Sequence, residues 1–161
     1  MRGALTWLAV VAGLLLAHSA TSTGRLLPFE PRRYDPRLLK TQSFLRQMDS
    51  PAYFLAEEFL LEADRNGLDW RLLPSISIVE SGGGKNYTNN NILGWDSCRR
   101  KFPSVVEGVH TVAHSLATSK LYKNKSLDRI LATYNPHRGY AGKVKLLMEH
   151  MGPRRGATPA F

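Results

Sequence analysis

One carboxyl group in this chain stands where it could act as an acid. Glu80 follows the apolar residues Ile76, Ile78 and Val79, and glycines occupy positions 82–84 directly after it. Apolar neighbours destabilise a charged carboxylate, so they raise its pKa toward neutral pH. Glycines let the chain turn sharply and leave room for a ligand. Such a proton donor is what cleavage of a glycosidic bond requires; the alternative is a helix that happens to end in Glu and a Gly cap.

Two other sets of residues could support different chemistry. Cys98 is the one cysteine, so it cannot form a disulfide within the chain, but it could be a nucleophile beside a histidine. Its position just before Phe102-Pro103 predicts a loop and favours an incidental thiol. His110 and His114 have the spacing of metal ligands on a helix, yet the sequence offers no clear third ligand. We therefore predict neither a metal nor a cofactor.

The start of the chain predicts export. Met1-Arg2-Gly3 precedes an apolar run over 4–17 and small residues up to 22. This pattern is typical of a secretory signal peptide, which we place at 1–22. The apolar run is short for a membrane span, so we expect no transmembrane span in the mature form. The expected location is secreted, periplasmic or associated with a cell wall.

The formal net charge of +9 over 161 residues points to an anionic partner. For an exported protein, a cell wall or acidic glycan suits this charge better than nucleic acid does. Four cationic residues after the glycines could attract such a polymer, although a solvated basic surface is the default interpretation: Lys85, Arg99, Arg100 and Lys101.

Composition divides the chain after the signal peptide into three parts. Residues 23–41 are rich in Pro and Arg and predict an extended leader, and residues 152–161 predict a disordered tail. The remaining stretch, 42–151, is long enough to build one domain with a real core. We expect this domain to be a monomer.

The periodicity inside that domain is helical and predicts a mostly α fold. Ser50-Pro51 should start a helix. Asp69 should cap a second helix, which is apolar nearly all round and is predicted to be the buried central one. Pro74 should either kink that helix or start a new one. The segment 82–103 lacks this periodicity and predicts a loop or small hairpin that lines one side of a cleft.

Later helices are predicted from their capping residues. Residues 104–107 form a capping box, Ser126 caps the next helix, and a last helix begins near Tyr140.

Three motifs, in this order, resemble the lysozyme-like superfamily of cell-wall glycosidases. The helix ending in Glu80-Ser81-Gly82 resembles the helix that carries the catalytic acid in soluble lytic transglycosylases and bacterial N-acetylglucosaminidases. Asn-Asn-Ile-Leu-Gly-Trp at 90–95 resembles the Asn-Asn-Leu-Phe-Gly-Ile segment of glycoside hydrolase family 73. Thr133-Tyr134-Asn135, followed by Gly139-Tyr140 and Val144, resembles the signature that closes these folds. Over about 52–148, the resemblance implies a lysozyme-like helical domain with a glycan cleft.

The resemblance also implies an activity and a site. The expected enzyme cleaves β-1,4 bonds between N-acetylated amino sugars of peptidoglycan, as an endo-β-N-acetylglucosaminidase, with Glu80 as general acid and Tyr134 beside the reacting sugar. Asp96 is the candidate base for water, unless the 2-acetamido group of the substrate or a muramic 6-hydroxyl replaces it; the alternative is a loop Asp that bonds its own backbone. Sugar contacts are expected from Ser81, Tyr87, Asn91, Gly94, Trp95, Asn135 and Tyr140.

Several alternatives stay open at this point. Tyr134, Trp95 and Tyr87 could pack in the protein instead, and Asn91 could hold a turn. The Gly-Leu-Met-Gln motif of lytic transglycosylases is absent, which counts against that branch, but transglycosylase or muramidase activity and a noncatalytic glycan-binding module remain. A membrane-disrupting protein would need an exposed basic helix, and the one candidate, 140–151, is better explained as a core helix.

Overall fold

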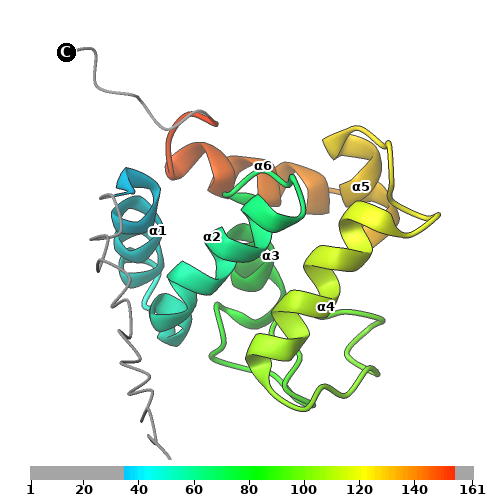
Figure 1. Ribbon diagram of the computed structural model, residues 1–161, viewed down its shortest axis with the longest axis horizontal. Helices are drawn as coiled ribbons and strands as arrows, with labels where there is room; N and C mark the ends of the chain where they lie inside the picture. Colours follow the sequence, from blue (N-terminus) through cyan, green and yellow to red (C-terminus); the bar gives the residue numbers. More distant parts are fainter. Residues whose placement is uncertain (1–34, 155–161) are drawn as a thin grey trace, which may run out of the picture. The chain divides into compact units, whose positions relative to one another are not determined.

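The computed structural model describes residues 35–154. Within this range the chain forms six α-helices and one 3₁₀ helix, and no strand (Figure 1): α1 (Pro36–Gln47), η1 (Pro51–Leu55), α2 (Ala56–Arg65), α3 (Leu72–Ser81), α4 (Val105–Thr118), α5 (Leu127–Tyr134) and α6 (Tyr140–His150). The prediction of a mostly α fold is confirmed for this part of the chain. The predicted signal peptide, the leader up to residue 34 and the tail from 155 lie outside the described residues.

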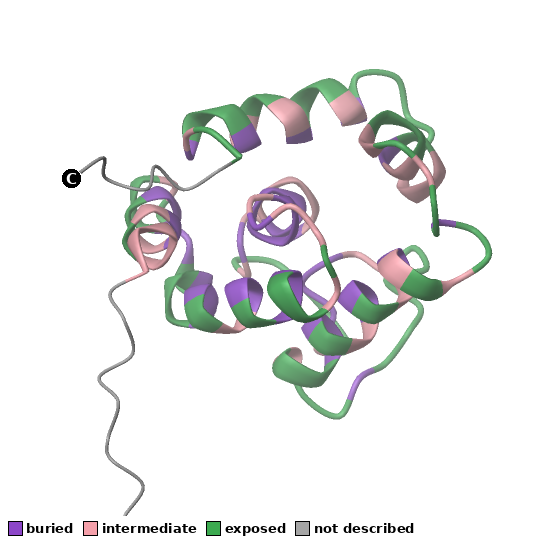
Figure 2. Ribbon diagram, turned by 45° about the horizontal axis from the view of Figure 1, so that its top comes forward, coloured by how far each residue is buried: buried purple, intermediate pink, exposed green. Residues whose placement is uncertain are grey.

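Helix α3 is the buried central helix, as its apolar sequence predicts. Every residue from 72 to 77 is buried, and Figure 2 shows the helix in purple with other helices around it. It packs against α2 and α6. A helix that is apolar on most sides is stable only when neighbours cover those sides, so its position follows from its composition.

Pro74 lies in the first turn of α3, because the helix begins only two residues earlier. The first turn of a helix has backbone N–H groups without intrahelical partners, so a proline there removes no hydrogen bond. The helix therefore starts close to Pro74, at Leu72. Asp69 lies ahead of it and accepts the backbone N–H of Arg71 at 3.1 Å. The prediction that Asp69 caps α3 is wrong, because the N-cap residue is Arg71 and no side chain caps the helix.

The folded region begins earlier than the predicted boundary at Gln42. Residues 36–41 belong to α1, which Asp35 caps by accepting the backbone N–H of Arg37. Phe44 and Leu45 of α1 are buried in the core, and the helix packs against η1 and α2. The proline at position 36 occupies the first turn of a helix rather than an extended leader.

The start of the predicted tail is also held in place. The Trp70 indole N–H donates to the Arg154 carbonyl at 2.8 Å, and the Arg71 guanidinium donates to the Gly152 carbonyl at 2.7 Å. These bonds tie the chain after α6 to the start of the central helix.

The predicted helix starts after α3 are confirmed by their caps. Ser104 accepts the backbone N–H of Glu107 at the start of α4, and Ser126 accepts that of Arg129 at the start of α5. Ser50 caps η1 through the Ala52 N–H and donates its own hydroxyl to the Gly83 carbonyl at 2.8 Å. The last contact ties η1 to the loop that follows α3.

The segment between α3 and α4 is a loop of turns and not a hairpin. Gly82 ends α3 in the left-handed conformation, with φ of 63°, and the loop returns to itself where the Phe102 N–H donates to the Asn89 carbonyl at 2.9 Å. No helix within 35–154 combines the length and the apolar character that crossing a membrane demands.

Candidate active site

Glu80 lies in the last turn of the central helix, with its side chain partly buried. Burial raises the pKa of its carboxyl group, because a charge loses solvation there. The nearby polar groups of Tyr140 and Asn135 favour the carboxylate and offset part of this effect. The sequence-based expectation of a raised pKa at Glu80 therefore agrees with its surroundings.

Gly94 brings the backbone of the loop against the Glu80 carboxyl. Its φ is +68°, which favours glycine, and a Cβ built on it would lie 2.7 Å from Glu80 Cδ. Real Cβ atoms do not approach other heavy atoms so closely, so a side chain at 94 would displace the carboxyl. Glycine at position 94 is thus favoured both by its backbone conformation and by the space that Glu80 occupies.

Two tyrosines, Tyr134 of α5 and Tyr140 of α6, lie close enough to this carboxyl for its charge to affect them. Tyr140 is buried, and its hydroxyl lies beside Glu80 without the geometry of a standard hydrogen bond. Burial and the neighbouring Glu80 both raise the pKa of Tyr140. The ring of Tyr134 stacks on that of Tyr140 at a centroid distance of 6.2 Å. Tyr140 therefore contacts the acid rather than presenting a face to a sugar.

The stack of tyrosines continues into a cluster of aromatic rings. Trp95 lies 5.5 Å from Tyr134 and 5.6 Å from Tyr122, measured between ring centroids. The Tyr134 hydroxyl donates a short hydrogen bond to the Leu93 carbonyl, so it fixes the loop next to Gly94. Aromatic rings in such arrangements attract one another beyond their simple burial.

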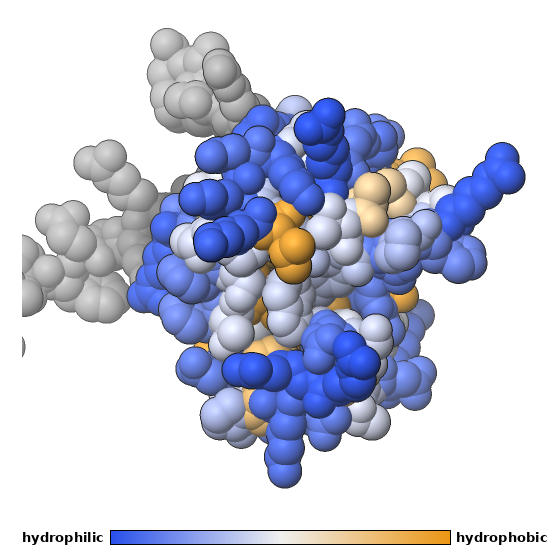
Figure 3. Space-filling view, turned by 90° about the vertical axis from the view of Figure 1, so that its right-hand side faces the viewer, coloured by the Kyte–Doolittle hydropathy of each residue, from blue (hydrophilic) through white to orange (hydrophobic). Residues whose placement is uncertain are grey.

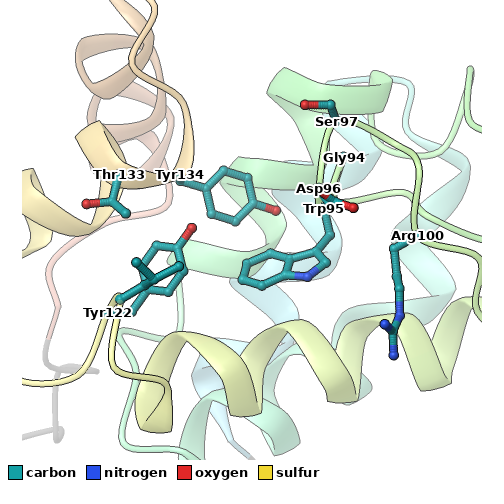
Figure 4. Close-up of a pocket in the computed structure, with 9 residues that line it drawn as sticks. Gly94, Trp95, Asp96, Ser97, Arg100, Tyr122, Thr133 and Tyr134 are labelled. Carbon is teal, nitrogen blue, oxygen red and sulfur yellow. The ribbon is translucent and has the colours of Figure 1, made fainter.

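These rings form one wall of a pocket of about 370 Å³, which we call the aromatic pocket (Figure 4). Glu80 adjoins it through Gly94 and is not itself in the lining. Its lining residues come from the loop, from the α4–α5 connection and from α5: Gly94, Trp95, Asp96, Ser97, Arg100, Leu121, Tyr122, Thr133 and Tyr134.

Two residues that are predicted to contact sugar, Ser81 and Asn91, are buried and bonded to backbone groups. Ser81 is 4% exposed, and its hydroxyl donates to the Ile92 carbonyl at 2.8 Å. Asn91 is 2% exposed; its amide donates to the Trp95 and Arg100 carbonyls, and its oxygen accepts the Trp95 N–H. The polar atoms of both residues are occupied by backbone partners, as expected for buried polar groups, and a sugar contact from either residue stays a prediction.

Asp96 lies at the pocket, but it is engaged by a neighbour. Its carboxylate pairs with the Arg99 guanidinium at 2.6 Å, and both side chains are well exposed. Its φ of 51° places it in the left-handed region, as do those of Ser97 and Cys98. The role of base for water therefore stays a prediction, with a salt bridge as the observed use.

Tyr87 and Asn135 lie apart from the pocket lining. Tyr87 is exposed and borders a smaller cavity of about 90 Å³ beside Phe54 and Val105. Asn135 follows α5 and faces Glu80, while its side-chain oxygen accepts the His137 backbone N–H at 3.0 Å. The structure thus brings Asn135 to the acid and leaves Tyr87 elsewhere.

Sequence reasoning missed Tyr122 and Thr133. Tyr122 follows the end of α4 in a short turn, where no periodic pattern distinguishes a pocket aromatic from a core one. Thr133 directly precedes Tyr134, so its place in the closing signature was the available signal. Both line the pocket only because α5 folds back toward the loop that carries Trp95.

The alternative nucleophile and metal sites find little support in the described residues. Cys98 is exposed, and His110 uses Nδ1 to contact the buried carboxylate of Glu62 at 3.0 Å. His110 and His114 stack on each other. Within 35–154 no three His, Cys, Asp or Glu side chains gather in a way that would hold a metal ion.

Comparison of the chain with protein-family models, with curated proteins and with solved structures found no match.

Proposed function

We propose that this protein is a secreted glycosidase with a lysozyme-like fold that cleaves β-1,4 bonds between N-acetylated amino sugars of peptidoglycan. The observation that carries the proposal is the setting of Glu80: a carboxyl of raised pKa at the end of the central helix, pressed against Gly94 and next to the aromatic pocket. Environment of this kind keeps a carboxyl protonated closer to neutral pH, where it can donate a proton.

In the proposed reaction, Glu80 transfers its proton to the glycosidic oxygen. The bond between that oxygen and the anomeric carbon breaks, the electron pair leaves with the oxygen, and an oxocarbenium-like state develops on the sugar. The 2-acetamido oxygen of the same sugar attacks the anomeric carbon from the other face. This attack closes a five-membered oxazolinium ring. Water then attacks the anomeric carbon and opens the oxazolinium ring, and the Glu80 carboxylate recovers a proton from that water.

Substrate assistance suits the site better than a second carboxylate does. Asp96 is the acidic residue of the pocket lining, and it is paired with Arg99. The Arg99 guanidinium donates to one oxygen of this carboxylate at 2.6 Å, so a water would have to compete with Arg99 for that oxygen. Asp96 is therefore proposed as a secondary contact and not as the partner of Glu80.

The test is the release of products from purified peptidoglycan, read by mass spectrometry. Glu80→Gln keeps the size of the side chain and removes its proton, so we expect turnover to fall by about 10²–10⁴-fold, the usual contribution of a general acid. Glu107→Gln is the matched control, because Glu107 is exposed at the start of α4. Retained activity in Glu80→Gln would overturn the assignment of the acid.

The same products define the bond that is cut. New reducing-end N-acetylglucosamine indicates a glucosaminidase, which we expect; reducing-end N-acetylmuramic acid indicates a muramidase, and 1,6-anhydro ends indicate a lytic transglycosylase.

A noncatalytic glycan-binding module is the second candidate, favoured by the fact that Glu80 adjoins the pocket without lining it. It predicts no products from the native chain, together with tight retention of both native chain and Glu80→Gln on the wall.

A further inference from the structure

The α4–α5 connection, residues 119–126, presents one large apolar side chain to solvent. Leu121 is 64% exposed, whereas the next residue, Tyr122, is buried and packs against the ring of Trp95. The backbone N–H of Tyr122 also donates to the Ser119 carbonyl at 3.0 Å. Because this turn and the buried ring hold the connection in place, the exposure of Leu121 is a fixed feature of the fold.

Cations accompany this leucine along the chain. Three lie in the connection and one in the first turn of α5: Lys120, Lys123, Lys125 and Arg129. None of them takes part in an ion pair among the described residues. The Lys125 ammonium donates to the Thr133 hydroxyl at 3.0 Å, which is a neutral partner. The positive charge of the segment is therefore not compensated by carboxylates.

Acidic residues are scarce in this half of the described chain. Over 97–154 there are eleven Lys or Arg and three Asp or Glu, whereas over 35–96 there are six and nine. Of those three, Glu107 lies in the first turn of α4 and Glu149 near the end of α6, both away from the connection. Asp128 is paired with a lysine of α6 at 2.7 Å. The surroundings of the connection are therefore strongly positive.

The connection also projects from the helices that it joins. In Figure 1 it is the yellow loop at the right-hand edge, between the end of α4 and the start of α5. Figure 3 looks onto that end and shows a hydrophobic patch near the middle, with hydrophilic side chains above and below it. An apolar side chain within a cationic margin suits a surface that is negatively charged outside and apolar beneath, as a layer of anionic phospholipids is.

The largest exposed apolar side chain elsewhere has a different electrostatic setting. Phe54 of η1 is 70% exposed, but Glu57 and Glu58 follow it in the first turn of α2. It also belongs to the half of the described chain in which acidic residues outnumber basic ones. Anionic headgroups would be repelled there. Charge complementarity thus favours the α4–α5 connection, and not η1, as the part that meets an anionic lipid surface.

We propose that the α4–α5 connection docks this protein on the surface of a membrane that contains anionic phospholipids. Leu121 enters the boundary between headgroups and acyl chains, and the cations around it bind headgroup phosphates. A single apolar anchor holds a protein only weakly, and a cationic cluster supplies the second signal that stable binding requires. Docking of this kind needs no spanning helix. It goes beyond the proposed glycosidase function and does not depend on it.

The experiment reads the connection itself, because the apolar run over 4–17 is a separate candidate for lipid binding. The full chain carries Cys98→Ser and one new cysteine, Thr118→Cys at the end of α4, labelled with a fluorophore that brightens in apolar surroundings. One set of vesicles contains equal parts of phosphatidylglycerol and phosphatidylcholine, and the other contains phosphatidylcholine alone. In the reference protein the same label is attached through Ser43→Cys, on α1.

We expect the label at position 118 to brighten with the anionic vesicles. The half-maximal lipid concentration should be about tenfold lower than with neutral vesicles at low salt, and the difference should shrink as ionic strength rises. The label at position 43 should not respond. No response at 118, an equal response at 43, or equal responses to both kinds of vesicle would overturn the proposal.

Two pairs of substitutions assign the effect to the connection. Leu121→Ser should raise the half-maximal concentration of anionic lipid about fivefold, and Leu39→Ser, 44% exposed on α1, should leave it unchanged. Lys123→Gln should also raise it about fivefold, with anionic vesicles only. Arg46→Gln removes an exposed cation from α1 and should have no effect. An equal effect within either pair would overturn the assignment.

Inorganic polyphosphate distinguishes a membrane from a charged polymer, because it is a polyanion without an apolar interior. We expect it to leave the label at position 118 dim. If polyphosphate reproduced the response to anionic vesicles, and Leu121→Ser did not alter that response, the partner would be a soluble polyanion and the proposal would be wrong. Vesicle binding is measured without glycan, so the result is independent of peptidoglycan cleavage and of the contact of Leu121 with the aromatic pocket.

Discussion

Two sets of polar and aromatic residues in the same loop region do different work. Ser81 and Asn91 form one set, which we call the buried support. Their side chains form hydrogen bonds with backbone groups of the loop. The aromatic pocket, by contrast, leaves Trp95, Leu121 and Arg100 with surface that a ligand can reach. From the sequence alone, residues of both sets were equally good candidates for sugar contacts. In the structure, one set holds the backbone of the loop in place, and the other set is exposed at the pocket.

Gly94 lines the aromatic pocket and also lies against the Glu80 carboxyl, so its replacement should have the largest effect in this comparison. In Gly94→Ala, the added Cβ collides with the Glu80 carboxyl, and displacement of a catalytic group by about 1 Å costs on the order of 10²-fold in rate. The positive φ adds about 1–2 kcal/mol of strain. Peptidoglycan turnover and urea unfolding are the measurements.

Gly67→Ala is the control for that strain. Gly67 has nearly the same φ, +64°, but nothing lies within 4 Å of a Cβ built there. We expect a similar loss of stability with native activity. If the two variants lost activity equally, the contact between Gly94 and Glu80 would have no catalytic importance.

Asn91→Ala should break the buried support and leave the pocket surface chemically unchanged. Three hydrogen bonds of a 2% exposed amide are lost and their backbone partners are left unpaired, so the free energy of unfolding should fall by about 1–3 kcal/mol. Asn86→Ala, at an exposed position of the same loop, should change it by less than about 0.5 kcal/mol. A stability of Asn91→Ala equal to that of the control would place Asn91 with the ligand-binding residues after all.

Leu121→Ser tests a residue that lines the pocket but contributes little to the stability of the fold. The side chain is 64% exposed, so stability should change by less than about 0.5 kcal/mol. Loss of partial apolar burial should weaken glycan binding by about 1 kcal/mol, or roughly fivefold. Leu146→Ser, 55% exposed on α6, is the matched control and should leave affinity unchanged. Equal affinities of the two variants would remove Leu121 from the binding surface.

The smallest effect expected is on the pH dependence of stability at Glu80. Because the folded-state pKa of Glu80 is raised, the folded protein holds the proton more tightly than the unfolded chain does. The stabilisation from that proton is complete below the ordinary Glu pKa and is lost as the pH rises through the folded-state pKa. Glu80→Gln should therefore gain stability relative to the native chain over this interval, measured by urea unfolding at a series of pH values. A constant difference across the series would contradict a raised pKa.

The starts of several helices could be predicted from the sequence. Ser104, Ser126 and Pro51 sit at helix starts because capping and the geometry of proline act over two or three residues. The composition of 72–79 likewise predicts burial, because an apolar helix must be covered. The early start of α1 at Pro36 was missed, since a proline followed by an arginine is compatible with both a leader and a first helical turn.

The sequence by itself determined that Glu80 lies near the end of a buried helix and that glycines follow this helix, because both depend on neighbours in the chain. Only the tertiary structure decided which polar residues remain for a ligand. Ser81 and Asn91 turn inward because the loop 82–103 needs partners for its backbone groups. Tyr122 and Thr133 join Trp95 because α5 and the α4–α5 connection fold onto that loop, over a separation in sequence that no local pattern encodes.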